Sequence, residues 1–419
     1  MAQQGRNLVV YDLGTVEYED GLVLQSAFAL ARRGRLKRDV LLLLEHSPVL
    51  TLGRGAEPED IKVSREELER HGVGVFQTDR GGNVTYHGPG QIVGYPIIDL
   101  APDRCDVRRY VRGLEDTMIG ALAEFGVKAG RIEGWTGVWV GEKGKDARKI
   151  GAIGLHLSRW VTTHGFALNL TTDLSHFDFI VPCGIREAGV TSVECELGRA
   201  PSMEAMKEAL ARNLAKRLGA NQHRGRIDQR TVSVVVLRPA GEGFEVLLLK
   251  RHPHRGGFWQ PITGTVERGE KPRACAMREL REESGFQGEV EPLGYVHSFL
   301  FGEPRAERTP RIFQETAFWT LVDGRDEVRL DAREHITSEW VPIAEAVERV
   351  PFAGLKAVIR RAARRAAGGA TVESRESRVE SRRSALDAAI DGRESRVESR
   401  ESGADRPGLA ADLRRQGHH

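Results

Sequence analysis

The stretch Arg80-Gly81-Gly82-Asn83-Val84-Thr85-Tyr86-His87-Gly88-Pro89-Gly90-Gln91, which continues to Tyr95-Pro96, decides how the first half of the chain is interpreted. Four glycines, a proline and several hydrogen-bonding side chains lie within these twelve residues. Glycine lets a backbone turn sharply and lets another molecule approach it closely. This composition is typical of a ligand-binding loop, and phosphate is the first ligand to consider.

The stretch does not match the common phosphate-binding loops. It contains no Gly-Lys-Ser or Gly-Lys-Thr, which a P-loop requires, and it lacks the strand–GxGxxG–helix context of a dinucleotide site. Residues 92–100 have the pattern of a strand, so no helix N-terminus follows to bind an anion. The sequence therefore disfavours phosphate at this position.

The length of 419 residues favours two domains with room for a third segment. The net charge of +2 disfavours the strong positive field of a nucleic-acid-binding protein. No apolar run is long enough to span a bilayer, and we expect no secretory signal. The four cysteines form no CxxC pair. We therefore expect a reduced, cytoplasmic protein with neither membrane nor nucleic-acid partners.

Hydrophobic periodicity divides the chain into a domain at 1–222, a second domain at 230–367 and a tail at 368–419, with a polar linker at 220–230. In the first domain we expect helices at 17–32, 64–71, 107–125 and 201–219, and strands at 8–12, 41–44, 49–52, 73–77, 92–100, 134–141, 149–160 and 166–170. In the second we expect strands at 232–237, 244–249 and 312–322, and helices at 272–284, 342–349 and 354–367.

The tail repeats Glu-Ser-Arg units and contains no aromatic residue. Such a segment cannot bury enough apolar surface to offset its chain entropy, which predicts a disordered, low-complexity tail. An interaction tail is the alternative.

Three features downstream of the glycine-rich stretch indicate acyl rather than phosphate chemistry. Cys183 lies in a turn-like context, Lys149 begins a predicted strand, and His164 precedes another. A free thiol has a pKa of about 8.5, and a nearby ammonium lowers it by roughly 1–3 units. A thiolate is suited to accept an acyl group as a thioester and pass it to an amine. Taken alone, a cysteine such as Cys183 is a small buried residue more often than a nucleophile, and sequence spacing does not reveal a pairing with Lys149.

Several separate motifs together resemble the lipoyl(octanoyl) transferases, the lipoate-protein ligase B family. The resemblance covers roughly residues 8–218 and is carried by Glu45-His46-Ser47-Pro48, Gly53-Arg54, Arg80 to His87, Gly90-Gln91, Tyr95-Pro96, Lys149 with Ala152-Ile153-Gly154, Gly165-Phe166-Ala167 and Pro182-Cys183-Gly184.

This resemblance implies an α/β fold like the catalytic domains of biotin and lipoate protein ligases. It implies that Cys183 takes octanoyl (or lipoyl) from acyl carrier protein and passes it to a lysine of a lipoyl domain, in 2-oxoacid dehydrogenase complexes or the glycine cleavage H protein. Lys149 would lower the pKa of the thiol, and no cofactor would be needed. The implied acyl-pocket residues are Arg80, Gly81, Gly82, Asn83, Val84, Thr85, Tyr86, His87, Ala152, Ile153, Gly154, Gly165, Phe166 and Ala167.

The roles of His87 and His164 stay open at this point. Either could position the thioester carbonyl or a proton, and either could instead be a hydrogen-bonded part of the pocket wall. No third metal ligand is evident beside them. A module that binds acyl groups without transferring them is the alternative for the whole domain, although simple binding needs no nucleophile.

A second motif lies in the other half of the chain. Gly264 is followed after five residues by Glu270, and after seven more by Arg278-Glu279-Leu280-Arg281-Glu282-Glu283-Ser284-Gly285-Phe286. Glutamates three and four residues apart share one face of a helix, where they repel one another unless a cation is present. Oxygen ligands of this kind suit Mg²⁺ or Mn²⁺. A solvated acidic helix face is the alternative.

This motif resembles the Nudix box, and the resemblance covers roughly 230–350. It implies an α/β/α sandwich that hydrolyses a nucleoside diphosphate linked to another group. Glu279, Glu282 and Glu283 would bind the metal, Arg278 would orient them, and Gly264, Glu270 and Glu334 would support the site. Phe258 to Gly264 and the Glu334-His335 and Trp340 positions are similar to the branch acting on dATP-like or dihydroneopterin triphosphates. A non-catalytic nucleotide sensor that regulates the transferase is the alternative.

Overall fold

The computed structural model describes residues 6–34, 36–144, 146–181, 188–241, 243–300, 309–323 and 327–367. Residues 1–363 form one compact unit, and a second unit begins at residue 364. The predicted tail at 368–419 and Cys183 lie outside the described residues. Among the helices that are described, none combines the length and the apolar character needed to cross a membrane.

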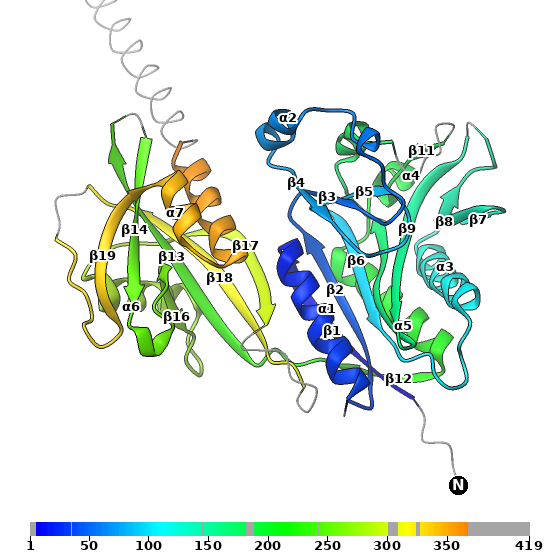
Figure 1. Ribbon diagram of the computed structural model, residues 1–419, viewed down its shortest axis with the longest axis horizontal. Helices are drawn as coiled ribbons and strands as arrows, with labels where there is room; N and C mark the ends of the chain where they lie inside the picture. The colour runs from blue at the N-terminus through cyan, green and yellow to red at the C-terminus, as the bar shows by residue number, and fades with distance from the viewer. Residues whose placement is uncertain are drawn as a thin grey trace, which may run out of the picture. The chain divides into compact units, whose positions relative to one another are not determined.

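A mixed sheet forms the centre of the first half (Figure 1). Strands β1 and β2 are parallel, and the strands that follow β2 are antiparallel to their neighbours. In spatial order the strands are β1 (Arg6–Val16), β2 (Asp39–His46), β6 (Gln91–Ile97), β10 (Val161–Asn169), β9 (Arg148–Ser158), β8 (Trp135–Val140) and β7 (Gly130–Ile132).

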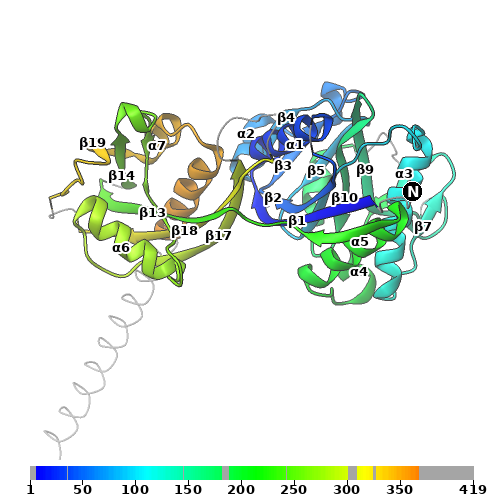
Figure 2. The ribbon, with the colours of Figure 1, turned by 90° about the horizontal axis from the view of Figure 1, so that it is seen from below.

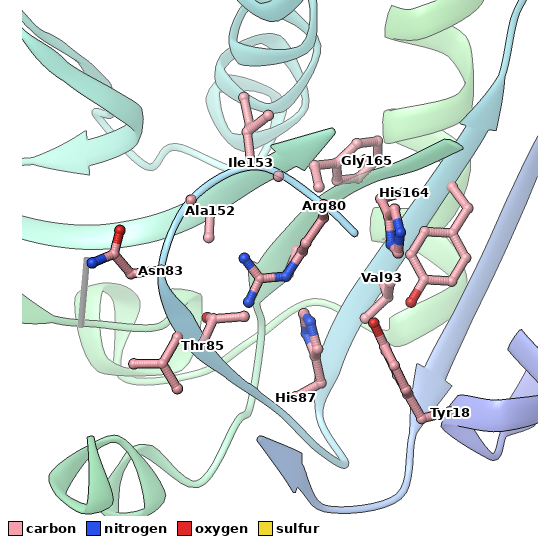
Figure 3. A pocket seen from close by; sticks show the side chains of 16 residues that line it. Tyr18, Arg80, Asn83, Thr85, His87, Val93, Ala152, Ile153, His164 and Gly165 are labelled. Carbon is pink, nitrogen blue, oxygen red and sulfur yellow. The ribbon is translucent and has the colours of Figure 1, made fainter. Parts of the chain in front are cut away.

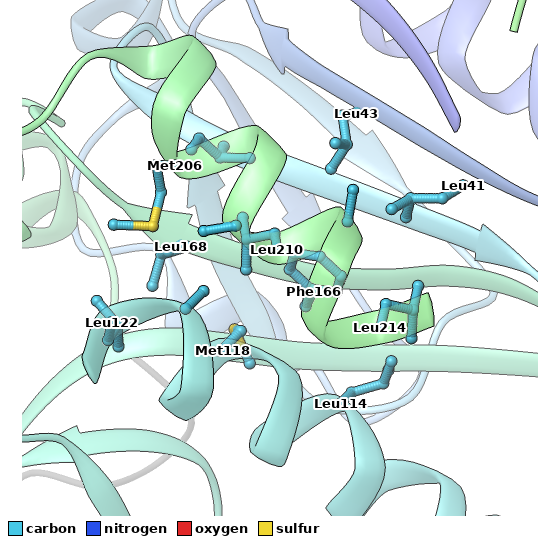
Figure 4. Close-up of a cluster of buried hydrophobic side chains, with 14 of the residues drawn as sticks. Leu41, Leu43, Leu114, Met118, Leu122, Phe166, Leu168, Met206, Leu210 and Leu214 are labelled. Carbon is cyan, nitrogen blue, oxygen red and sulfur yellow. The ribbon is translucent and has the colours of Figure 1, made fainter. Parts of the chain in front are cut away.

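Helices cover both faces of this sheet because its strands alternate between two apolar clusters. Leu41 and Leu43 of β2 belong to the cluster formed with α3 (Val107–Glu124) and α5 (Met203–Leu218), which Figure 4 shows. Leu42, between them, belongs to the opposite cluster, which includes residues of α1 (Tyr18–Arg33). The side chains of a strand alternate with a period of two, so the near-continuous apolar run of β2 predicts burial on both faces.

The glycine-rich stretch connects the central sheet to a small second sheet. Its residues Val84–His87 form β5, which pairs with β3 (Val49–Leu52), and β3 pairs with β4 (Gly74–Gln77). The chain turns at Gly90, whose φ is +81°, and then enters β6. Between β3 and β4 lies α2 (Arg65–Arg70), where the Ser64 side chain caps the helix by accepting from the amide of Glu67. The stretch thus lies at the junction of the two sheets.

The end of the first half contains the remaining short elements. These are η2 (Leu174–Phe179), β11 (Gly189–Val190), which pairs with β9, and α4 (Val193–Leu197).

A second sheet region and its helices form the other half as an α/β/α sandwich. Figures 1 and 2 show α6 on one face of the sheet and α7 on the other. The strands are β13 (Gln229–Ala240), β14 (Gly243–Arg251), β15 (Trp259–Gln260), β16 (Ile262–Thr265), β17 (Glu291–Leu300), β18 (Ile312–Leu321) and β19 (His335–Pro342), and the helices are α6 (Pro272–Ser284), α7 (Ile343–Arg349) and a helix at 353–367.

Among the described strands, eight were not expected from the sequence: β5, β7, β11, β12, β15, β16, β17 and β19. Residues Ala220–Arg224, assigned to a linker, form β12, which pairs with β1 in parallel. Its side chains are mostly exposed, so its sequence lacks the apolar alternation that identifies a strand. Strands β17 and β19 also mix exposed and buried positions irregularly.

Candidate functional site

A cavity opens between the glycine-rich stretch and strands β9 and β10 (Figure 3). It measures about 520 Å³, a volume that includes space open to solvent. Its lining is mostly apolar with a few polar groups. The lining residues are Tyr18, Arg80, Gly82, Asn83, Val84, Thr85, His87, Val93, Tyr95, Ala152, Ile153, Gly154, His164, Gly165, Phe166 and Ala167.

Small residues let the walls of this cavity approach one another. A Cβ atom on Gly165 would lie 2.2 Å from the carbonyl oxygen of Gly94, so β10 and β6 can pack this closely only with glycine there. A Cβ on Gly154 would lie 3.0 Å from the Arg80 side chain. These positions belong to the motifs that the sequence singled out.

The guanidinium of Arg80 is held against the small sheet. It is 7% exposed, and it donates to the Thr51 carbonyl at 2.5 Å and to the Thr51 hydroxyl at 2.8 Å. A charged group this deeply buried requires such partners. Arg80 therefore presents a fixed positive charge at the wall of a mainly apolar cavity.

Two buried histidines beside the cavity are held neutral. Burial lowers the pKa of His46 to about 4 and that of His87 to about 3. The Nδ1 of His46 donates to the Val16 carbonyl at 2.6 Å, which leaves Nε2 to accept from the Tyr95 hydroxyl at 2.6 Å. The Nδ1 of His87 donates to the Gln91 side chain at 2.6 Å. Neutral rings in fixed tautomers define the polar side of the cavity.

His164 differs because it pairs with a carboxylate. Its Nε2 donates to Asp79 at 2.8 Å, and its backbone has a φ of +55°. Its amide donates to the buried side chain of Gln25 at 2.6 Å. Burial lowers the pKa of His164, although Asp79 acts in the opposite direction. No group of His, Cys, Asp and Glu side chains in the described ranges is arranged to hold a metal ion.

Lys149 lies on β9 and is 9% exposed. Its Nζ is 4.6 Å from the centre of the Trp139 ring, a cation–π distance. The chain that follows the undescribed residues 182–187 returns to this strand, since Val190 of β11 pairs with Lys149. Cys195 and Cys105 are exposed free thiols, and Cys275 is buried.

In the second half, Arg278 donates hydrogen bonds to three glutamates, two in α6 and one just before it. Its guanidinium donates to Glu279 at 2.7 Å, to Glu282 at 3.0 Å and to Glu270 at 3.1 Å and 3.2 Å. These bonds raise the pKa of Arg278, with Glu270 as the largest cause. A Cβ on Gly264 would lie 2.0 Å from the Glu279 carboxyl carbon, so only glycine at position 264 leaves room for the Glu279 side chain.

Glu283 is the buried member of the set. It is 4% exposed, and its carboxylate accepts from the Thr263 amide at 3.4 Å. Burial first, and the neighbouring charge of Glu279 second, raise the pKa of Glu283 to about 9. The carboxylates of Glu279 and Glu282 accept from Arg278, and among the described residues the three glutamates are not grouped as a metal site, so metal binding by them stays a prediction. Glu334 is bound instead to Arg255, at 2.9 Å.

Comparison with known proteins decides the family. A family model described as "Lipoyl protein ligase A/B catalytic domain" matches residues 17–215, and one described as "NUDIX domain" matches residues 228–362. A protein named "Octanoyltransferase" from Myxococcus xanthus is 51% identical over 356 residues, which cover 85% of this chain and 99% of the relative. The chain belongs to the octanoyltransferase family.

Other octanoyltransferases match the first half alone. The protein from Solibacter usitatus is 50% identical over 211 residues, covering 50% of this chain and 93% of the relative. The protein from Chloroflexus aggregans is 50% identical over 210 residues, covering 50% of this chain and 94% of the relative. The predicted family and fold class, a ligase-like octanoyltransferase domain followed by a Nudix domain, are thereby confirmed.

The cavity of the octanoyltransferase half contains the pocket residues that the sequence suggested, except Gly81 and Tyr86. Tyr86 belongs instead to a cluster with Phe177 and Ile180, because successive side chains of β5 point to opposite faces. The sequence did not identify Tyr18, Val93 and Tyr95 as lining residues. The pocket functions assigned to all of these residues stay predictions.

Proposed function

We propose that the octanoyltransferase half uses Cys183 as its nucleophile, takes octanoyl (or lipoyl) from acyl carrier protein and delivers it to a lysine of a lipoyl domain. The observation that supports this proposal is the cavity lined in part by β9, the strand that carries Lys149. Its walls are mostly apolar, which suits an acyl chain, and its polar groups include the neutral His87 and the Arg80 guanidinium, which already donates to Thr51. The lipoyl domains meant are those of 2-oxoacid dehydrogenase complexes and the glycine cleavage H protein.

The reaction divides into two acyl transfers. The Cys183 thiolate attacks the thioester carbonyl, a new C–S bond forms, and the carrier's sulfur leaves. The substrate amine then attacks the enzyme thioester, a C–N bond forms, and the Cys183 sulfur leaves. As an ammonium, Lys149 stabilises the thiolate and then gives its proton to the departing carrier sulfur. The neutral amine that remains accepts the proton that the substrate amine releases, which restores the ammonium for the next cycle. No cofactor enters either step, because the incoming thioester is already activated.

Mass spectrometry tests this mechanism directly. The full chain incubated with octanoyl-acyl carrier protein is expected to gain one octanoyl group on the peptide that contains Cys183. Cys183→Ala should abolish the adduct and the transfer, whereas Cys195→Ala, which removes an exposed free thiol, should keep both. Absence of the Cys183 adduct in the unmodified chain would refute the proposal.

For the Nudix half, we propose hydrolysis of a nucleoside diphosphate linked to another group. The match to the NUDIX domain model and the glutamates around Arg278 support this proposal. Glu279, Glu282 and Glu283 would hold Mg²⁺ or Mn²⁺, with Arg278 and Glu270 orienting them. When bound, the metal would offset charge on the diphosphate and activate water. The chain's own contribution is the position of the carboxylates, which Arg278 restrains.

A nucleotide panel with Mg²⁺ separates catalysis from the alternative of a non-catalytic sensor. Hydrolysis that is lost in Glu282→Gln but kept in Glu289→Gln supports catalysis, since Glu289 is exposed and pairs with Arg273 away from the glutamate set. Tight nucleotide binding without any hydrolysis would favour the sensor.

A further inference from the structure

The Nudix half contacts the octanoyltransferase half through a hydrogen-bonded cluster beside the acyl cavity. The hydroxyl of Tyr295 in β17 donates to the Glu17 carboxylate at 2.5 Å. Ser47 donates to the same carboxylate oxygen at 2.5 Å. Arg361, in the helix at 353–367, donates to Ser47 at 3.4 Å and lies 4.2 Å from the centre of the Tyr295 ring. Two Nudix side chains therefore hold two octanoyltransferase side chains.

Each of those two octanoyltransferase residues is the sequence neighbour of a residue in or directly behind the cavity wall. Glu17 is the N-cap of α1, and the next residue, Tyr18, lines the cavity. Ser47 follows His46, whose ring accepts from the Tyr95 hydroxyl, another lining group. The Tyr18 ring lies 5.2 Å from the His46 ring and is stacked on the His87 ring at 6.4 Å. Glu17 thus lies between Tyr295 and the lining residue Tyr18. Ser47 lies between Arg361 and His46, which contacts the lining residue Tyr95.

A second set of contacts between the two halves is made by residues 13–15 of β1, away from Glu17 and Ser47. Ser298 donates to the Leu13 carbonyl at 2.7 Å, and His297 pairs with Thr15 of β1. Gly14, at a φ of +62°, lies where β1 is irregular and where a Cβ would meet the Val296 carbonyl at 3.4 Å. Ile312 of β18 joins the apolar cluster of the octanoyltransferase half. These contacts bind the halves together without reaching Tyr18 or His46.

We propose that the Nudix half is a positioning element of the acyl-transfer site. Tyr295 and Arg361 fix Glu17 and Ser47. These in turn fix Tyr18 in the cavity wall and His46 behind it, where His46 accepts from the lining residue Tyr95. The inference rests on the proposed acyl transfer. The Myxococcus xanthus relative aligns over both halves, so it retains the pairing of the two domains in one chain.

The expected consequence is a change in how the acyl group is bound rather than in the chemical step. Without the hydrogen bond from Tyr295, the Glu17 carboxylate at the start of α1 is held less firmly. The Tyr18 side chain, which lines the cavity, can then take more than one position. Binding of the octanoyl chain weakens, while Lys149 keeps its contact with Trp139. A group that acts on binding alone raises KM and leaves kcat unchanged.

The test compares two conservative variants of the full chain in a steady-state transfer assay with octanoyl-acyl carrier protein. Tyr295→Phe removes one hydroxyl and keeps the ring under Arg361. We expect its KM for the acyl donor to rise about three- to tenfold with kcat nearly unchanged. Ser298→Ala removes an interface hydrogen bond that does not lead to the cavity, and its KM should stay at the wild-type value. An unchanged KM in Tyr295→Phe, or an equal rise in both variants, would overturn the inference.

A double-mutant cycle locates the effect. If Tyr295 acts through the carboxylate, then combining Tyr295→Phe with Glu17→Gln should cost no more than the larger single change. Fully additive effects would show that Tyr295 acts by another route.

Hydrogen exchange separates failure of this inference from failure of the proposed reaction. Amides in peptides covering 17–28 and 42–50 should exchange faster in Tyr295→Phe than in wild type and Ser298→Ala. This readout needs no acyl transfer, so it applies even if the wild-type chain forms no adduct. Equal exchange in all three proteins would refute the positioning role.

Discussion

The indole of Trp139 lies against the ammonium group of Lys149 in a buried part of the octanoyltransferase half. The Lys149 Nζ is 4.6 Å from the ring centre, and Trp139 is 2% exposed. Trp139 in turn packs against Trp135, with ring centres 5.0 Å apart. An aromatic face attracts a cation and limits its positions. Trp139 therefore restrains the group that the proposed mechanism places beside the nucleophile.

The first prediction concerns the charge of Lys149. Lys149→Met removes the ammonium but keeps a side chain of similar length, so the pKa of the Cys183 thiol should rise by roughly 1–3 units. Alkylation of Cys183, measured peptide by peptide across a pH series, should then need a correspondingly higher pH.

Lys143→Met is the matched control because Lys143 is exposed and lies over Trp135, 5.7 Å from the ring centre, rather than over Trp139. An alkylation profile of Cys183 that is the same in all three proteins would show that Lys149 does not act on the thiol.

At the scale of residues, the sequence predicted those cavity positions that lie within continuous motifs. Tyr18 and Tyr95 show why others were missed or given no role. Tyr18 lies at the start of a helix far from the glycine-rich stretch, and its place beside His87 arises from tertiary packing alone. Tyr95 was noticed as part of a motif, but its bond to His46 depends on the pairing of β2 with β6.

Among the elements, the β9–β10 hairpin connects several cavity residues through an unfavourable turn. Arg159 and Trp160 have φ values of +51° and +63°, in the left-handed region. A two-residue hairpin turn with both φ values positive favours Asn-Gly. Neither arginine nor tryptophan is suited to this conformation, which costs of order 1–2 kcal/mol per residue.

The second prediction compares two replacements of this turn. Arg159→Asn with Trp160→Gly should have a free energy of unfolding roughly 1–2 kcal/mol higher than Arg159→Gly with Trp160→Val, because a β-branched residue is disfavoured at a positive φ whereas Asn-Gly is favoured. Trp160 is 39% exposed, and the packing of its buried part is lost equally in both variants. Denaturant unfolding measures the difference. Equal stability of the two variants would contradict the turn argument.

The elements also show where sequence periodicity succeeds and fails. Strand β2 was predicted because both of its faces are buried, and α3 because its apolar side is regular. Strand β12 was not predicted, because an exposed strand that pairs through its backbone needs no apolar side chains. Prediction from one sequence therefore identified the buried elements better than those at the edge.

For the whole molecule, two buried carboxyl groups lie near the contact between the halves. Burial raises the pKa of Asp20 in α1 to about 7, with Glu17 and Glu19 adding to the rise. Burial also raises the pKa of Glu315 in β18 to about 7, and the charge of Asp20 adds to it. His297, 3.7 Å from Glu315, has its pKa lowered to about 3 by burial and then by Arg361, so it stays neutral above that pH. The native unit thus favours the protonated form of Glu315 near neutral pH.

The last prediction follows from the sign of this shift. The pKa of Glu315 rises from 4.5 in the unfolded chain to about 7 in the folded one. Its contribution to stability is therefore complete below about pH 4.5 and is lost as the pH rises through 7. Glu315→Gln keeps the shape and cannot ionise, so it should gain roughly 3 kcal/mol over wild type between pH 4.5 and pH 8. Denaturant unfolding of both proteins across this range measures the gain. Glu339→Gln, at an exposed carboxylate paired with Arg349, should show no such trend. A stability difference for Glu315→Gln that does not change with pH would show that folding does not shift the pKa of Glu315.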